Sequence, residues 1–225
     1  MTLESEKGVR KQIQSSSAAK ENVGGSSVIH RRRPLLVATI AFVIVLACSG
    51  SAWAFNTFNG HVLNGGVGDY GADARLYYIT SSASGHQSDI TSAMSDWIHT
   101  TSRLGITTPI AWLRTTTQSD SVMDIYHNTY YDPATGIVAA TEQILNNVAI
   151  DPYQSNWHWG KIKLNTPVFD PLSDFNEKGA IAHEMGHMFG LAHTTVTNRI
   201  MCQLADGRTV NACQADDANG INYLY

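Results

Sequence analysis

The chain has 225 residues, of which 43% are hydrophobic and 15% are charged, and its formal net charge is −4 at pH 7. These values suit one globular domain with an additional N-terminal segment. Residues 1–54 hold seven of the 15 Lys and Arg residues but three of the 19 Asp and Glu residues, which leaves residues 55–225 with a net charge of −8. An acidic balance of this size argues against nucleic acid as a partner.

Residues 1–54 have the features of an export signal. Residues 1–33 are polar and end in three arginines, and residues 35–47 are a 13-residue run of small and apolar side chains. That run is too short to span a bilayer comfortably and has the length of a signal-peptide core. The Ala-Trp-Ala sequence that ends at Ala54 supplies a cleavage site, so we predict a signal peptide with a long polar first region. The alternatives are an uncleaved membrane anchor, a buried core helix, a twin-arginine signal, or a lipoprotein acylated at Cys48.

The remaining chain predicts a mixture of strands and helices. Residues 55–71 are rich in Gly and Asn and predict a flexible N-terminus of the mature chain. An amphipathic helix is predicted at 88–101, and a second helix from Asp174, its N-cap, to about Gly190, with Ser173 and Asn176 as alternative caps. Short strands are predicted at 75–80, 110–114, 122–127, 137–141 and 160–164.

One stretch of the second helix concentrates histidines and reads His-Glu-Met-Gly-His-Met-Phe-Gly-Leu-Ala-His at 183–193. His183 and His187 are four residues apart, so on a helix they lie on one face and reach one metal ion. Gly190 lets the chain leave the helix in a left-handed conformation and return His193 as a third ligand. Glu184 stands beside the first ligand, where it can act as a general base. Three ligands leave the fourth position to water, which is typical of a catalytic zinc.

This H-E-x-x-H-x-x-G-x-x-H motif resembles that of the metzincin zinc proteases. Within that clan the chain resembles the matrixins, the family of the matrix metalloproteinases, because Thr194 follows the motif and Met201 stands eight residues after His193, as in the family's Met-turn. The run at 216–225 is similar to the family's ending, which opens the last helix. The resemblance covers residues 72–225.

The resemblance implies an α+β fold, in which a twisted mixed β-sheet covers the active-site helix and is followed by the Met-turn and a C-terminal helix. It implies a secreted, monomeric zinc endopeptidase that acts on protein or peptide substrates, with Glu184 as catalytic residue and Met201 packed beneath the zinc ligands. Those ligands are His183, His187 and His193. By the same resemblance, residues 136–141 form the edge strand beside the cleft, to which a peptide substrate adds as an extra strand.

Two alternative functions stay open. A non-catalytic zinc-binding protein of the same fold needs the three histidines but not Glu184, so the presence of this residue favours an enzyme. A membrane-anchored protein that faces outward would keep residues 1–54. The acidic excess is also compatible with bound calcium, although no EF-hand loop or Asp-rich repeat identifies its ligands.

Some features depart from the family pattern. No cysteine lies between Cys48 and Cys202, so the family's propeptide cysteine is absent. No set of histidines matches the family's second, structural zinc, because His127 and His158 stand alone in the sequence. Cys202 and Cys213 are an even pair in an exported chain and predict a disulfide, which by resemblance closes the loop that walls the S1′ pocket. Two free buried thiols are the alternative.

Overall fold

A computed structural model describes residues 55–225 of the chain. The predicted signal peptide at 1–54 lies outside these residues. Within the described part, no helix is both long enough and apolar enough to cross a membrane.

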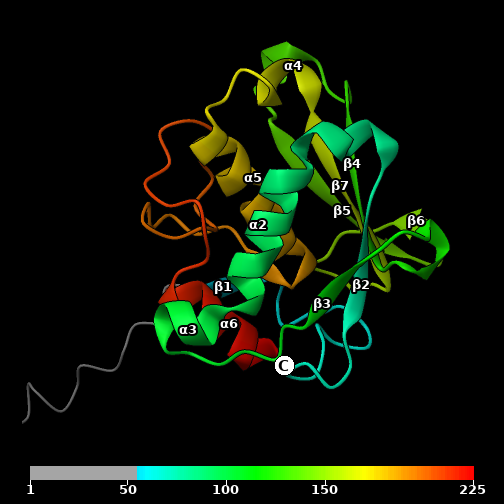
Figure 1. The fold of residues 1–225 in the computed structure, drawn as a ribbon, viewed down its shortest axis with the longest axis vertical. Coiled ribbons are helices and arrows are strands. Elements are labelled where there is room, and N and C mark those ends of the chain that lie inside the picture. Colours follow the sequence, from blue (N-terminus) through cyan, green and yellow to red (C-terminus); the bar gives the residue numbers. More distant parts are fainter. Residues whose placement is uncertain (1–54) are drawn as a thin grey trace, which may run out of the picture. The chain divides into compact units, whose positions relative to one another are not determined.

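A six-stranded sheet forms one layer of the domain, with strand order β3-β2-β4-β7-β5-β6 (Figure 1). Strands β3, β2, β4 and β7 are parallel, whereas β5 is antiparallel to β7 and β6 is antiparallel to β5. The strands are β2 (Arg75–Ile79), β3 (Trp112–Thr115), β4 (Met123–Asn128), β5 (Ala139–Leu145), β6 (Val148–Ala149) and β7 (Trp159–Asn165). All five predicted strands are present within a few residues of their expected bounds, because their β-branched and aromatic side chains suit a sheet that is buried on one face.

Two long helices, α2 (Gln87–Ile98) and α5 (Asp174–Met188), pack against each other beside the sheet (Figure 1). The indole nitrogen of buried Trp97 on α2 donates to the carbonyl oxygen of Ala182 on α5 over 3.0 Å. The helix predicted at 88–101 ends earlier, at Ile98, and a separate short helix follows it. The shorter helices are α3 (Thr100–Leu104), α4 (Thr166–Phe169) and α6 (Ala215–Leu224), and the 3-10 turns are η1 (Ser81–His86), η2 (Gln118–Asp120) and η3 (Pro133–Thr135).

The prediction of a flexible segment at 55–71 is wrong, because this segment packs onto the domain. Strand β1 (Asn56–Thr57) pairs antiparallel with β8 (Leu191–Ala192), which directly follows helix α5. The backbone N–H of Leu63 donates to the Tyr225 hydroxyl over 3.0 Å. The segment also buries three apolar side chains, which are Phe58, Leu63 and Val67. Its Gly-rich composition hid these residues, since they follow no helical or strand period.

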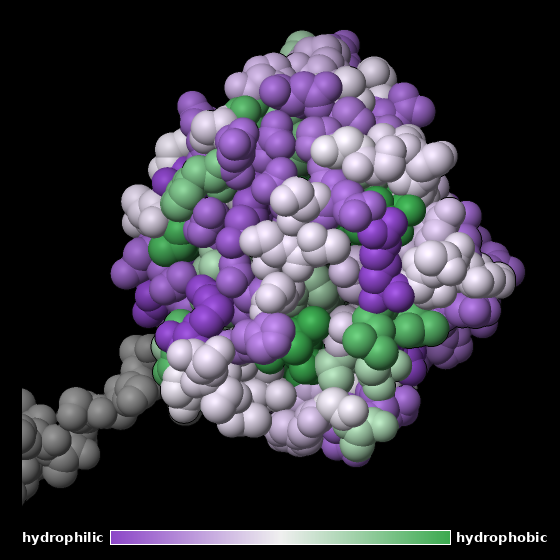
Figure 2. All heavy atoms as spheres, in the orientation of Figure 1, coloured by the Kyte–Doolittle hydropathy of each residue, from purple (hydrophilic) through white to green (hydrophobic). Residues whose placement is uncertain are grey.

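The surface is mixed in character. On the face drawn in Figure 2, hydrophilic and intermediate side chains cover most of the area, and apolar side chains form small separate groups. Large exposed apolar residues of the described chain lie on different elements, for example Leu113 on β3, Val148 on β6 and Tyr223 on α6. The apolar side chains therefore lie mainly in the core between the sheet and the helices.

Candidate active site

Helix α5 carries most of the predicted site, and both of its ends are defined by local chemistry. Its N-cap is Ser173, whose hydroxyl accepts from the Asn176 N–H, and not Asp174 as first expected. Asp174 instead lies in the first turn, where a negative charge favours the helix dipole. The helix ends before Gly190, whose φ of +98° lies in the region that favours glycine. The chain then turns into β8 and brings His193 back toward the helix.

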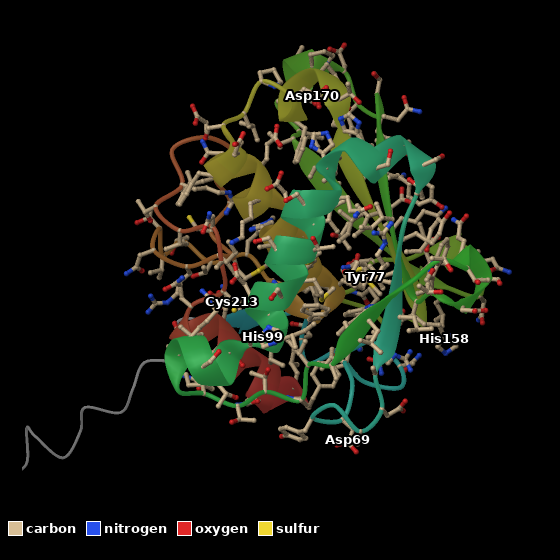
Figure 3. All side chains as sticks on the ribbon, viewed as in Figure 1. Asp69, Tyr77, His99, His158, Asp170 and Cys213 are labelled. Carbon is tan, nitrogen blue, oxygen red and sulfur yellow. The ribbon has the colours of Figure 1, made fainter. Side chains whose placement is uncertain are left out.

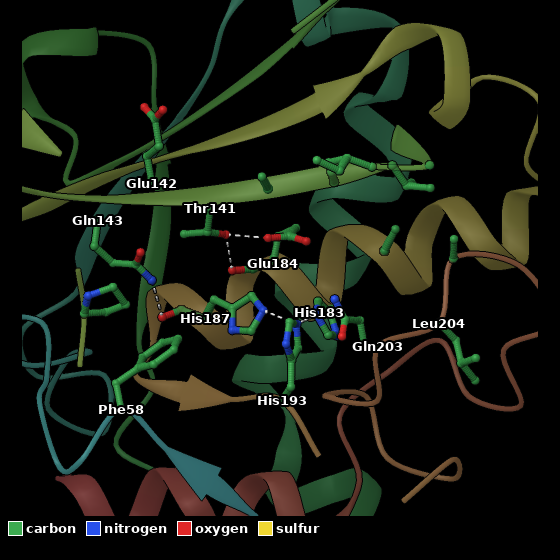
Figure 4. A pocket seen from close by; sticks show the side chains of 18 of the residues that line it. Phe58, Thr141, Glu142, Gln143, His183, Glu184, His187, His193, Gln203 and Leu204 are labelled. Carbon is green, nitrogen blue, oxygen red and sulfur yellow. Dashed lines mark hydrogen bonds between the residues drawn. The ribbon is translucent and has the colours of Figure 1, made fainter. Parts of the chain in front are cut away.

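Three imidazoles meet at this turn (Figure 4). The Nε2 atom of His193 lies 3.1 Å from Nε2 of His183 and 3.0 Å from Nε2 of His187. On their other side, Nδ1 of His183 lies 2.8 Å from the carbonyl oxygen of Ile200, and Nδ1 of His187 lies 2.8 Å from that of Leu191. Because a carbonyl only accepts, these two Nδ1 atoms carry the ring protons and leave the Nε2 lone pairs free.

This arrangement fits a zinc ion. Nitrogen ligands at about 2.0–2.1 Å from a tetrahedral zinc stand about 3.3 Å apart, close to the separations of the Nε2 atoms here. Burial lowers the pKa of His187 to about 4 and the pKa of His183 well below its usual value, so both rings are neutral at pH 7. The backbone carbonyls that hold the Nδ1–H groups match the outer shell usual for metal-bound histidines.

Glu184 is buried beside this histidine cluster. Its Oε2 atom lies 2.7 Å from the hydroxyl of Thr141, which is also 2.9 Å from the carbonyl oxygen of Glu184. Burial raises the pKa of Glu184 to about 7, against the lowering effect of the Thr141 hydrogen bond. No sequence motif indicated this role for Thr141, apart from its place in the strand predicted to border the cleft.

Strand β5 faces the helix with alternate residues (Figure 4). Thr141 contacts Glu184, and Nε2 of Gln143 donates to the carbonyl oxygen of His187 over 3.3 Å. Between them, Glu142 points away and pairs with Lys163. The β5 side remote from β7 pairs with β6 only at its last two residues. The prediction of an edge strand beside the cleft therefore holds for the first part of β5, although residues 136–138 precede the strand.

A cleft of about 640 Å³ contains the cluster. Strand β5 forms one wall, α5 the floor, and the loop at 203–208 the opposite wall. Arg208 of that loop donates from Nη1 to the carbonyl oxygen of Ile200 over 3.2 Å, the same oxygen that holds His183. Burial lowers the pKa of Arg208 to about 10, so it is still charged at pH 7. Nothing in the sequence singled out this residue.

Met201 lies beneath the histidines, where the Met-turn resemblance places it. A side chain at Gly186, between the two helical histidines, would collide with the Met201 sulfur. The turn is also anchored by α6, because Oδ2 of Asp217 accepts from the N–H groups of Ile200 over 3.2 Å and of Gln214 over 2.7 Å. The last helix thus fixes the backbone that holds His183.

The predicted disulfide between Cys202 and Cys213 is wrong, since both are free, buried thiols. The Cys213 sulfur lies 3.4 Å from the Asp96 carbonyl oxygen and accepts from Nη1 of Arg103, also over 3.4 Å. Its side chain is therefore directed at α2 and α3 (Figure 3) and not at the loop it was expected to close. Burial raises the pKa of Cys213 to about 12. Polar contacts hold the loop instead, such as that of Asn176 Nδ2 with Asp206 Oδ1 over 2.6 Å.

A comparison with models of protein families agrees with this geometry. The sequence model described as matrixin, peptidase M10, matches residues 82–225. No curated protein matches the chain. Among solved structures, one titled "GM1 bound form of the ECX AB5 holotoxin" aligns with 73% of this chain and 86% of its own, at 11% identity and a TM-score of 0.41, a likeness too weak to support any argument. With the family match over most of its length and a mixed sheet beside the histidine-bearing helix, the chain belongs to the matrixin family and has its α+β metzincin fold.

Proposed function

We propose that the protein is a zinc-dependent endopeptidase that cleaves peptide bonds in exported or extracellular substrates. The observation that carries this proposal is the convergence of three histidine Nε2 atoms beside a buried carboxylate with a pKa near 7. Matrixins are metalloproteases and are typically extracellular, which supports the class of reaction and its location. A protein that only bound zinc would need the histidines but not Glu184.

His183, His187 and His193 would hold the zinc ion. When bound, zinc supplies a Lewis acid that polarises a carbonyl and makes a water molecule acidic near pH 7. The histidines are neutral, so they leave the full charge of the ion in place. The hydrogen bonds from Nδ1 of His183 and His187 to backbone carbonyls fix the ring orientations before substrate arrives.

Glu184 would move the proton. Its carboxylate accepts a proton from the attacking water and delivers it to the nitrogen of the departing amine. A pKa of about 7 suits both steps at neutral pH, because the carboxylate can accept a proton and the carboxylic acid can donate it with similar ease. The hydrogen bond from Thr141 orients the carboxylate for this transfer.

The first part of β5 would bind the substrate backbone. Within residues 55–225 no strand pairs with the outer side of this part, so an extended peptide can add to its N–H and C=O groups with the scissile bond near the histidines. The loop that carries Arg208 would receive the side chain after the scissile bond. Calcium stays a prediction, since this chemistry does not use it.

A peptide library tests the proposal. The purified full chain, loaded with zinc, is incubated with a diverse library, and cleavage sites are read by mass spectrometry. We expect a chelator to abolish cleavage and added zinc to restore it. The His193→Ala variant should show both a lower cleavage rate and a lower zinc content. His158→Ala, a change outside the cleft lining, serves as the matched control and keeps activity. A folded, zinc-loaded protein that cleaves no peptide would contradict the proposal. N-terminal sequencing of the exported protein tests cleavage before Phe55.

A further inference from the structure

A second group of histidines and carboxylates lies at the N-terminal end of α5, apart from the cleft. Nε2 of His127 is 2.6 Å from Oδ1 of Asp170, and Nε2 of His86 is 3.8 Å from the same oxygen. The two imidazole rings stand 4.5 Å apart between their centroids. On the other side of its ring, Nδ1 of His86 is 3.3 Å from Oε2 of Glu177. His127 is therefore not isolated, as its place in the sequence suggested.

Four elements of the fold contribute to this group. His86 ends η1 directly before α2, and His127 lies in β4. Asp170 follows α4 (Figure 3), and Glu177 lies in the first turn of α5. Such distant segments meet here only because the sheet and both long helices converge at this end of the domain, so a ligand held by the group would connect them.

The hydrogen bond from His86 to Glu177 determines which ring nitrogen of His86 carries the proton. A carboxylate accepts, so Nδ1 of His86 carries the proton and Nε2 presents a lone pair. That lone pair lies on the side of His127 and Asp170. By the same rule, Nε2 of His127 donates to Asp170 in this structure, so this nitrogen becomes a ligand when a metal ion displaces its proton. The ligand atoms of His86, His127 and Asp170 all lie within 4.8 Å of one another. A histidine whose far nitrogen donates to a carboxylate is the usual outer-shell arrangement of a metal ligand.

The local charge also favours a cation. Asp89 and Glu177 also lie within 4.8 Å of His86 through their carboxylates. Among residues 55–225, the ion pairs of Asp170 and Glu177 are made with histidines, and the nearby Lys178 pairs with Asp96 over 2.6 Å. The side chain of Asp170 is 46% exposed, which leaves an open side for water or a further ligand.

We propose that Nε2 of His86, Nε2 of His127 and a carboxylate oxygen of Asp170 form a second metal site, selective for zinc, with Glu177 as the outer-shell partner of His86. Two imidazoles and one carboxylate are a ligand set that zinc favours over calcium or magnesium. A second set of possible ligands, His86 with Asp89 and Glu177, offers only one imidazole. A metal ion there would have to bind Nδ1 of His86, which already donates to Glu177. This site is independent of the proposed protease activity.

Metal counting tests the proposal directly. The full chain is stripped with a chelator and titrated with zinc chloride by calorimetry, and metal content after dialysis is measured by mass spectrometry. We expect two zinc ions per wild-type chain, one per His127→Gln chain, and two per chain in the matched control His158→Gln. The variant His193→Ala should weaken binding of the other ion and leave this one in place.

Two milder variants keep the test decisive if His127→Gln does not fold. Glu177→Gln keeps all three ligands and should weaken the second zinc about 10- to 100-fold, the usual effect of an outer-shell change. Asp170→Asn should remove the second zinc while circular dichroism shows a folded domain. If wild type and all three variants bind the same number of zinc ions with the same affinity, the group is a network of ion pairs only and the proposal is wrong.

Discussion

The hydroxyl of Thr141 lies 2.7 Å from Oε2 of Glu184, so a residue of strand β5 holds a carboxylate of helix α5. This contact joins one wall of the cleft to its floor at the atom that would move the proton. Strand β5 therefore has two parts in the proposed reaction, since it offers its edge to the peptide and also orients the general base.

Thr141→Val should lower kcat about 10-fold, because it keeps the shape of the side chain and removes a hydrogen bond to a charged group, worth about 1.5–3 kcal/mol. The bond lowers the pKa of Glu184, so its loss should move the acidic limb of the kcat/KM profile to higher pH. Steady-state kinetics over a pH range measure both effects. Thr141→Ser should retain most activity, and an unchanged pH profile in the valine variant would refute the orienting role.

Glu184→Gln should reduce kcat at least about 100-fold while zinc content stays at the wild-type level. The amide keeps the size of the side chain and can accept from Thr141, but it cannot take a proton from water. Turnover with the library's best peptide and metal analysis of the same sample give the two readouts. Turnover close to that of wild type would remove Glu184 from the mechanism.

The two cysteines should behave as buried free thiols. The intact mass of the unreduced protein should equal that of the dithiol form, and alkylating reagents should label Cys202 and Cys213 only after unfolding. Mild reductant should leave the cleavage pattern unchanged, since polar contacts hold the loop wall. A mass lower by two hydrogens in the unreduced protein would instead support the disulfide.

Asp217 should make the stability of the domain depend on pH. Burial raises its pKa from 3.8 to about 6, so the folded state binds a proton more tightly than the unfolded chain does. Its contribution is therefore complete below about pH 4 and is lost as pH rises through about 6, a change of about 3 kcal/mol.

Asp217→Asn keeps an acceptor oxygen for the Ile200 and Gln214 N–H groups but does not titrate. Urea unfolding of both chelator-treated proteins at pH 4 to 7 measures the difference. Between these limits, the free energy of unfolding of the variant should rise by about 2.4 kcal/mol relative to wild type, which is most of the full change. A constant difference across the range would show that Asp217 does not titrate as described.

Local rules of the chain were enough to predict the centre of the site. His183 and His187 share a helix face because of their spacing, and Gly190 allows the reversal that returns His193. The strands were predicted for the same reason, since alternation of apolar side chains is a property of a few neighbouring residues. The boundaries of elements were predicted less well, as in the helix predicted to reach residue 101, which ends at Ile98.

Only the tertiary structure decided which distant residues meet. Thr141 reaches Glu184 because β5 crosses α5, and His86 reaches His127 because η1 ends beside β4. The wrong disulfide prediction has the same cause, since the pair of cysteines in residues 55–225 could not reveal that Cys213 faces α2 and α3. The spacing of apolar residues in the sequence shows which face of one helix or strand packs on the core. Contacts between elements depend on how those elements pack together, and no local spacing encodes this packing.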